Sequence, residues 1–235
     1  MERFRKENQL AELPLANLIV GEGLADVAFL DALLEQRGLR AYCHLGFPDG
    51  LHKGKDGFGD YLVGLRTKLE RQNSGTQRIL VVTDSDDDPN LSFRNVCQHI
   101  RNANVLLEAP RHYSVPNAIR ELSAGAAPQI AVGIMPWDNE AGCLETLLLT
   151  AADDGSHPLH DCFEAYWQCV RFDANRKNVQ SKKKLTTIIA ATNDKNPSCS
   201  LGMIWSNEQR AGNPMRIDHQ AFVRWGAFLD EFVIH

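Results

Sequence analysis

The sequence predicts an α/β protein in which a mainly parallel central sheet is flanked by helices and followed by a helical C-terminal lobe. Three observations support this fold class. Short apolar runs alternate with segments whose apolar residues repeat at helical spacing, as in βαβ units. The run 78–83 (RILVVT) has a continuously apolar centre, which is typical of a strand buried on both faces. Beyond about residue 150 the strand signals stop and helical segments follow.

The first half of the chain contains three strand–helix units in order. A strand at 16–20 (ANLIV) is followed by a Gly-Glu-Gly turn and a helix at 24–37. A second strand at 40–46 leads through a loop rich in glycine and lysine to a helix at 58–71. The third strand, 78–83, runs into the acidic loop DSDDDPN.

The elements after the acidic loop begin with a helix at 91–102. Two shorter strands are predicted at 104–107 and 130–135, and a further helix begins near residue 142. Three more helices are predicted toward the C-terminus, at 158–171, 179–192 and 218–233. We therefore expect an α/β core at 14–137 and a mainly helical extension at 138–235 packed on it.

Composition narrows the class of protein. At 235 residues the chain is long enough for one large domain or one domain with an appended lobe. The net charge of −5 argues against a generic basic nucleic-acid coat. No apolar run reaches the roughly 20 residues that span a bilayer, and the six cysteines form no CxxC pair. We expect a soluble, cytoplasmic protein with reduced thiols.

Carboxylates follow two of the predicted strands. Glu22 comes directly after the first strand and Asp84 directly after the strand at 78–83. Ligands of open parallel sheets bind at the carboxyl ends of the strands, so both side chains are expected at one edge. In extended backbone Asp84 and Asp86 would point the same way, roughly 6–7 Å apart. A divalent cation such as Mg²⁺ or Mn²⁺ would relieve their repulsion. In isolation, DSDDDPN is equally well explained as a solvated, helix-capping turn.

These residues resemble the Toprim signature, which is a glutamate after the first strand and a DxD motif after a later one. The matching segments are Leu-Ile-Val-Gly-Glu22-Gly-Leu-Ala-Asp26 and the strand that runs into Asp84-x-Asp86. Toprim domains occur in topoisomerases, bacterial primases, recombination-repair proteins and the overcoming-lysogenization-defect (OLD) nucleases. The large extra domains of topoisomerases and primases are not recognisable here, so the OLD nucleases are the nearer comparison. The chain also resembles a small bacterial branch of Toprim-like proteins, through MPWDNEAGCLE (135–145) and KKKL (182–185).

The resemblance implies roles for five carboxylates. Glu22 would be the general acid/base or a metal ligand near the scissile phosphate. Asp84 and Asp86 would bind the divalent ion, with Asp88 as a helper. Asp26 lies one helical turn after Glu22 and would be a further metal ligand, as a second acidic residue is in OLD-like enzymes. An acid at a helix N-terminus, favoured by the helix dipole, is the alternative for Asp26.

Further candidates lie outside the two motifs. Glu145 can complete a second metal site or simply cap its helix. Lys53 and Lys55 follow the second strand and are expected to contact phosphate, unless they are ordinary exposed loop lysines. Lys182 and Lys184 are candidate catalytic residues that would stabilise the transition state or grip a nucleic-acid backbone. A solvated basic helix end is the alternative for these two.

The leading hypothesis is a Mg²⁺- or Mn²⁺-dependent nuclease of Toprim/OLD-like type that acts in phage defence. Many OLD-like nucleases work with an ATPase, and this chain has no Walker A motif, so an ATPase partner is expected. The other expected partners are nucleic acid, with DNA favoured over RNA, and a second copy of the chain; no membrane partner is expected. One alternative is a non-catalytic or partner-activated Toprim-like regulatory subunit. A weaker one is a nucleotide-sugar transferase that uses the DxD motif for its metal, which leaves Glu22 without a role.

Overall fold

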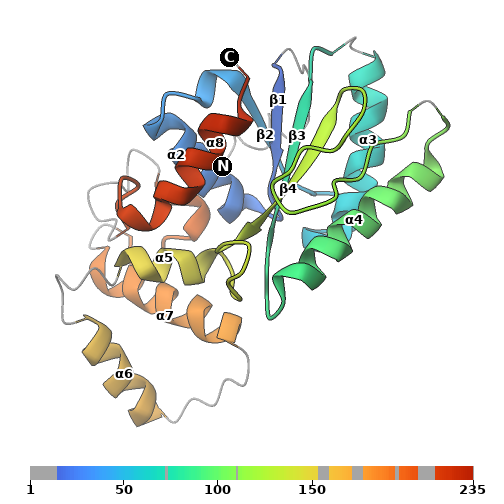
Figure 1. The fold of residues 1–235 in the computed structure, drawn as a ribbon. Coiled ribbons are helices and arrows are strands. Elements are labelled where there is room, and N and C mark those ends of the chain that lie inside the picture. The colour runs from blue at the N-terminus through green and yellow to red at the C-terminus, as the bar shows by residue number, and fades with distance from the viewer. Residues whose placement is uncertain are drawn as a thin grey trace.

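A four-stranded sheet forms the centre of the protein (Figure 1). The computed structural model describes residues 15–71, 74–109, 111–152, 159–170, 177–193, 196–205 and 215–234. All neighbouring strands pair in parallel, in the order β2-β1-β3-β4. The strands are β1 (Asn17–Val20), β2 (Cys43–Gly46), β3 (Arg78–Asp84) and β4 (Gln129–Met135). The predicted α/β class is confirmed; residue 14, the first of the predicted core, lies outside the described residues.

Helices cover both faces of the sheet (Figure 1). One face carries α3 and α4, and the other carries α2 and α8. Their bounds are α2 (Leu24–Gln36), α3 (Phe58–Arg71), α4 (Pro89–Leu106) and α8 (Val223–Phe232). The protein therefore has three layers, with a hydrophobic cluster on each side of the sheet.

The strands supply side chains to both clusters. Because successive residues of a strand point to opposite faces, Ile79 and Val81 of β3 pack with α3 and α4. Leu80 and Val82 pack in the cluster that contains α2 and α8. This burial on both faces explains the continuously apolar centre of the strand.

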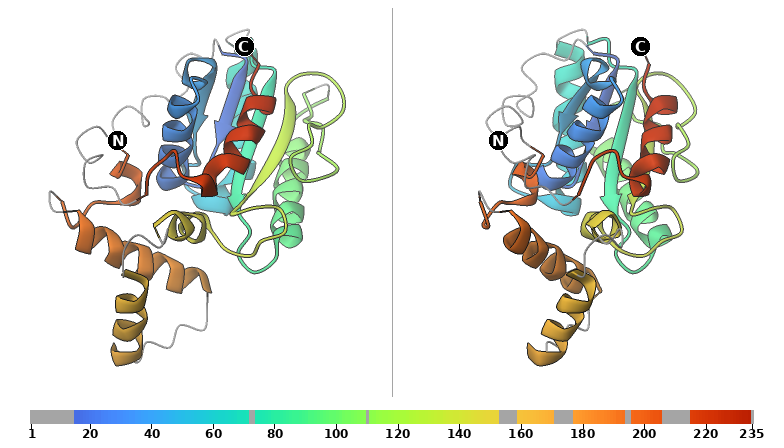
Figure 2. Two further views of the ribbon diagram at one scale, coloured as in Figure 1. Left: turned by 60° about the vertical axis from the view of Figure 1, so that its left-hand side comes forward. Right: turned by 90° about the vertical axis from the view of Figure 1, so that its left-hand side faces the viewer.

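Three further helices follow β4. They are α5 (Leu144–Ala152), α6 (Leu159–Val170) and α7 (Lys177–Thr192). α5 and α7 lie side by side below the carboxyl ends of the strands, and α6 lies beyond α7, away from the sheet (Figures 1 and 2). The C-terminal part of the chain is thus mainly helical, as predicted.

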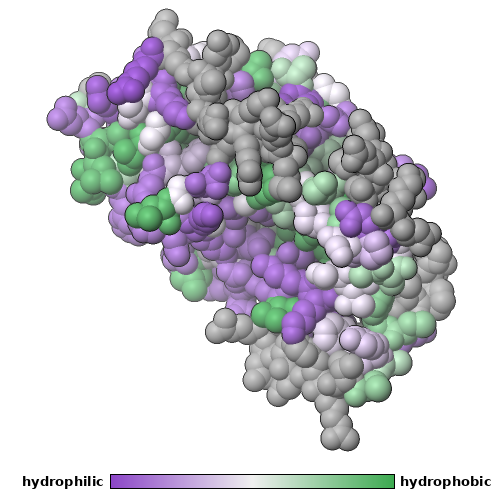
Figure 3. Space-filling view, turned by 180° about the vertical axis from the view of Figure 1, so that it is seen from behind, coloured by the Kyte–Doolittle hydropathy of each residue, from purple (hydrophilic) through white to green (hydrophobic). Residues whose placement is uncertain are grey.

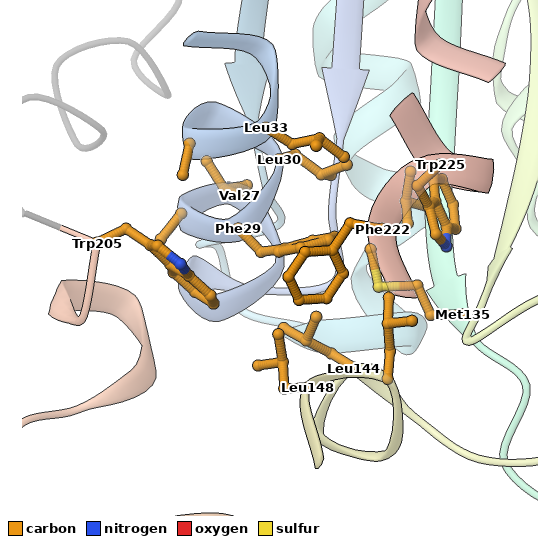
Figure 4. Close-up of a cluster of buried hydrophobic side chains, with 14 of the residues drawn as sticks. Val27, Phe29, Leu30, Leu33, Met135, Leu144, Leu148, Trp205, Phe222 and Trp225 are labelled. Carbon is orange, nitrogen blue, oxygen red and sulfur yellow. The ribbon is translucent and has the colours of Figure 1, made fainter. Parts of the chain in front are cut away.

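One hydrophobic cluster contains residues from the N-terminal and the C-terminal parts of the chain (Figure 4). The ring centroid of Phe29 on α2 lies 5.2 Å from that of Phe222 and 5.7 Å from that of Trp205. Leu144 and Leu148 of α5 belong to the same cluster. This packing fixes the start of α5 against the sheet, next to the end of β3.

The predicted strand at 104–107 is wrong, because α4 continues through its first three residues. Ile100, Ala103 and Leu107 are buried at helical spacing, whereas Val105 is 82% exposed. The apolar residues of this run therefore form the buried stripe of a helix together with exposed neighbours.

Two other predicted elements begin later than expected. The predicted strand at 40–46 opens with a 3₁₀ turn at Arg40–Tyr42 and becomes β2 only at Cys43. The predicted helix at 218–233 opens with a 3₁₀ turn at Gln220–Phe222, after which α8 begins.

The surface seen from behind is mainly hydrophilic across its described part, with hydrophobic residues scattered over it (Figure 3). Most large apolar side chains lie in the two clusters beside the sheet. Among the described residues, no helix has both the length and the apolar character needed to cross a membrane.

Candidate metal site at the carboxyl edge of the sheet

Glu22 and Asp84 meet at the carboxyl edge of the sheet. Val81 is the last residue of β3 that pairs with β1, so the end of β3 projects beyond its neighbour. Glu22 lies in the turn after β1, and its Oε1 accepts the backbone N–H of Asp84 at 2.7 Å. The same oxygen accepts the hydroxyl of Thr83. The two carboxylates that sequence reasoning placed at one edge are therefore neighbours.

The carboxylate of Asp84 faces the start of α5. Its Oδ1 accepts the backbone N–H of Leu144 at 2.9 Å, which is one of the N–H groups that a helix leaves unpaired at its first turn. Asp84, Cys143 and Glu145 each offer one ligand atom, and these atoms lie within 4.8 Å of one another. The structure thus brings Glu145 close to Asp84, and metal binding by the two stays a prediction.

Burial and mutual repulsion act on these carboxylates. Burial raises the pKa of Asp84 well above its ordinary range, and the charges of Glu22 and Asp26 raise it further. Burial also raises the pKa of Glu22, although Lys55 and the hydroxyl of Thr83 act in the opposite direction. Such a group of carboxylates favours a proton or a bound cation.

Asp26 is buried at the start of α2. Its Oδ2 accepts the backbone N–H of Gly23 at 2.9 Å, so it makes the helix-terminal contact expected from the alternative interpretation. Burial raises its pKa to about 7, with the charge of Glu22 as the next cause. Asp26 therefore caps α2, and the charge of Glu22 also affects its pKa.

Lys55 lies among the site oxygens, in a 3₁₀ turn (Gly54–Gly57) between β2 and α3. Its Nζ donates to the backbone carbonyl of Asp84 at 2.9 Å, pairs with the carboxylate of Asp86 and lies 3.5 Å from Oε1 of Glu22. Burial lowers the pKa of Lys55, but Glu22 and Asp86 outweigh it and raise the pKa overall. Its proximity to the acidic edge was predicted correctly.

Lys53 differs from Lys55. Its side chain is exposed, and its backbone pairs with Asp49 in an isolated bridge. Contact with phosphate stays a prediction for both lysines, but only Lys55 touches the carboxylates that we describe.

The expectation that Asp84 and Asp86 point the same way is wrong. β3 ends at Asp84, and Asp86 has a φ of 52°, in the left-handed region. Asp86 exchanges two backbone hydrogen bonds with Gly142, at 2.8 and 2.7 Å. Its carboxylate turns to Lys55 and to the Nδ2 of Asn178, which donates at 2.6 Å. The loop geometry thus sends the two carboxylates of the DxD motif to different partners.

Asp88 caps α4. Its Oδ1 accepts the backbone N–H groups of Asn90 and Leu91 at 2.9 and 3.1 Å. Its other oxygen lies 4.0 Å from Nη2 of Arg94. Asp88 makes these contacts at the start of α4. A role for Asp88 in metal binding stays a prediction.

The loop between β4 and α5 is held from two sides. The guanidinium of Arg120 lies 3.1 Å from the ring centroid of Trp137. The hydroxyl of Ser85 donates to the backbone carbonyl of Glu140 at 2.7 Å. Gly142 has a φ of 147°, and a Cβ there would lie 2.7 Å from the hydroxyl of Thr146 at the start of α5. These contacts hold the loop in place, so Cys143 and Glu145 stay beside the end of β3.

α7 presents one face to the site. Asn178 and Ser181 lie on that face, where Oγ of Ser181 accepts the hydroxyl of Thr146 at 3.1 Å. Lys182 follows at the spacing that keeps it on the same side as Asn178. Burial lowers the pKa of Lys182, but the charges of Glu145 and then Asp84 raise it overall.

Lys184 lies on α7 two residues after Lys182 and three residues after Ser181. The charges of Glu145 and Asp84 act on Lys182, and a catalytic role stays a prediction for both lysines.

Sequence reasoning missed three residues of the site. Thr83 immediately precedes Asp84, and its hydroxyl pairing with Glu22 has no signal in the sequence. Cys143 carries a buried thiol whose pKa burial raises to about 12; its signal was its position two residues before Glu145. Asn178 has no signal in the sequence, because it reaches the site only through the packing of α7 on α5.

Comparison with known proteins places the chain in a family. No curated protein matches it, and no solved structure matches it. A family model matches residues 16–229, which include parts of both the predicted core and the C-terminal extension. The chain belongs to this family, which is described as "Protein of unknown function (DUF3226)".

Proposed function

We propose that the chain is a Mg²⁺- or Mn²⁺-dependent nuclease of Toprim/OLD-like type that hydrolyses phosphodiester bonds at the carboxyl edge of its sheet. The observation that carries the proposal is the convergence of Glu22, Asp84 and Glu145 from three separate elements. A purely structural cluster would not need several buried and half-buried carboxylates together, because each one costs free energy unless it is paired.

The residues present fit a divalent ion. Asp84 and Glu145 offer hard oxygen ligands, the kind that Mg²⁺ and Mn²⁺ prefer. We assign the ion to these two carboxylates and treat the thiol of Cys143 as a neighbour, because thiols suit softer metals. A bound ion would supply positive charge to the phosphate and lower the pKa of water.

Side chains other than the metal ligands take the remaining roles in the proposed reaction. Glu22 has a raised pKa because of burial, so it can hold and release a proton closer to neutral pH than an ordinary glutamate. Lys182 of α7, on which the charges of Glu145 and Asp84 act, presents a positive charge to an incoming phosphate. Asp26 and Thr83 hold the turn and the side chain of Glu22 in place.

The biological setting of the proposal comes from the OLD resemblance. We infer DNA as the preferred substrate over RNA, a cytoplasmic location, and an ATPase as partner in phage defence.

Cleavage assays test the proposal. The purified chain is incubated with plasmid, single-stranded DNA and RNA, in Mg²⁺, in Mn²⁺ and in a chelator. We expect metal-dependent cleavage of at least one substrate. The Asp84→Asn variant, which keeps an oxygen for the N–H of Leu144, is expected to lose activity by about 10²-fold or more.

The matched control is Asp87→Asn, which removes an exposed carboxylate from the same loop. It is expected to cleave like the wild type. Cleavage that survives in Asp84→Asn would refute the assigned site. No cleavage by the wild type with any substrate or metal, alone or with an ATPase encoded beside it, would refute the nuclease.

A further inference from the structure

The ammonium of Lys55 lies near three oxygen atoms, from the turn after β1 and from the loop at the end of β3. They are the backbone carbonyl of Asp84, a carboxylate oxygen of Asp86 and Oε1 of Glu22. The Lys55 side chain is only 27% exposed, and that of Glu22 only 17%. The ammonium donates hydrogen bonds to the first two oxygens and forms an ion pair with the third at 3.5 Å. Oxygen atoms grouped in this way would also suit a small cation.

A second group of ligand atoms lies around the carboxylate of Asp84. Its carboxylate faces the N–H of Leu144 and lies within 4.8 Å of the ligand atoms of Cys143 and Glu145. The backbone carbonyl of Asp84 faces Lys55 instead. Asp84 thus separates two subsites, one that contains the ammonium and one that contains the carboxylates near α5.

Enzymes that use two metal ions hold them roughly 4 Å apart. Both subsites use an oxygen of Asp84, which is the carboxylate in one and the backbone carbonyl in the other. A lysine ammonium is positively charged at neutral pH, and it would strongly repel a divalent ion entering among its own oxygen partners. Because it is covalently attached, it also occupies this place at any metal concentration.

We propose that the site binds one divalent ion per chain, on the Asp84 and Glu145 side, and that the ammonium of Lys55 takes the place of a second ion. In this role Lys55 balances the charges of Glu22 and Asp86 and keeps both side chains oriented. The inference rests on the proposed function for its metal site, but it concerns the number of ions and not the reaction.

Counting bound Mn²⁺ tests this inference. Isothermal titration calorimetry, with free Mn²⁺ measured by electron paramagnetic resonance, gives the stoichiometry. We expect one Mn²⁺ per wild-type chain. The Lys55→Met variant leaves the three oxygen groups without the ammonium, so it is expected to bind two.

Two further variants serve as controls. Lys55→Arg keeps a positive charge in the turn and is expected to bind one Mn²⁺. Lys53→Met removes the same charge from an exposed neighbour in the same loop, so its stoichiometry is also expected to stay at one. Circular dichroism confirms that each variant is folded before its ions are counted.

The outcomes separate this inference from the proposed function. Two Mn²⁺ ions per wild-type chain would overturn the role of Lys55 and leave the nuclease standing. A folded Lys55→Met protein that still binds one ion would do the same. A wild-type chain that binds no Mn²⁺ would overturn both. If Lys55→Met does not fold, the wild-type count alone decides, since one ion supports the inference and two contradict it.

Discussion

Glu22 accepts the backbone N–H of Asp84 at 2.7 Å, although 62 positions separate the two residues along the chain. The contact ties the turn after β1 to the end of β3, so one carboxylate orients the backbone that carries the other. A substitution at Glu22 therefore acts on the chemistry of its own carboxylate and on the position of Asp84. The two effects can be separated by keeping the hydrogen-bond acceptor and removing only the charge.

The Glu22→Gln variant makes that separation. The glutamine oxygen can still accept the N–H of Asp84, but it cannot take up a proton. If Glu22 is the general acid/base, we expect metal-dependent cleavage to fall by about 10²–10⁴-fold with an unchanged unfolding temperature. Single-turnover cleavage and thermal unfolding measure the two quantities.

Glu231→Gln, an exposed glutamate on α8, is the control and should cleave like the wild type. Near-normal cleavage by Glu22→Gln would contradict the acid/base role. A nucleotide-sugar transferase that uses only the DxD motif needs no chemistry from Glu22, and it would transfer sugar in both the wild type and Glu22→Gln without cleaving nucleic acid.

The buried carboxyl of Asp26 makes stability depend on pH in a predictable direction. Its pKa is about 7 in the folded protein because of burial and the charge of Glu22, against about 3.9 for an unfolded aspartate. The folded chain therefore holds this proton more tightly than the unfolded chain does. The contribution of Asp26 to stability is most favourable below about pH 4 and is lost as the pH rises to about 7.

Asp26→Asn removes this titration and keeps an acceptor for the N–H of Gly23. Relative to the wild type, its free energy of unfolding is expected to rise by on the order of 2 kcal/mol between pH 5 and pH 8. Urea unfolding in the presence of a chelator measures it. Asp87→Asn, with an exposed carboxylate, should show no such trend. An equal difference between Asp26→Asn and wild type at both pH values would contradict the assignment.

The sequence was sufficient to predict where Glu22, Asp84 and Lys55 lie, because apolar runs mark the strands and parallel strands end at one edge. Directions of side chains beyond the strand ends were not predictable. Asp86 turns to Lys55 because its backbone is left-handed, and Asn178 reaches it only through the packing of α7 on α5. Such contacts depend on tertiary structure, which no local pattern encodes.

Close packing in the sheet predicts a stability change at Gly133. A Cβ there would lie 2.9 Å from the ring of Trp225 and 3.5 Å from Leu80, and the ring is fully buried. We expect Gly133→Ala to lower the free energy of unfolding by about 1–3 kcal/mol, as overpacking of a core does. Chemical denaturation measures the change.

Gly64→Ala is the control, and its expected effect on stability has the opposite sign. Gly64 lies within α3, where a Cβ would have no heavy atom within 4 Å among the described residues. Alanine at this position should raise stability by about 0.5–1 kcal/mol, because glycine costs helix entropy. If both substitutions changed stability by the same amount and sign, the contact with Trp225 would not be the cause.

Lys182 and Lys184 of α7 give the last prediction. Lys182 lies on the same side of the helix as Asn178, and the charge of Glu145 acts on it. Lys184 lies two residues further along α7 and serves as the comparison. If Lys182 balances charge in the transition state, Lys182→Met should slow cleavage by about 10²-fold, mainly through kcat. Lys184→Met should reduce it far less.

The Lys182→Arg variant tests whether the positive charge of the Lys182 side chain or its shape matters for cleavage. Lys182→Arg keeps the positive charge and is expected to restore part of the activity that Lys182→Met loses, whereas a purely structural role would show no dependence on charge. Cleavage rates measured over a range of salt concentrations add a second measurement, since screening weakens an exposed charge. Equal losses in Lys182→Met and Lys184→Met would contradict a specific role for Lys182.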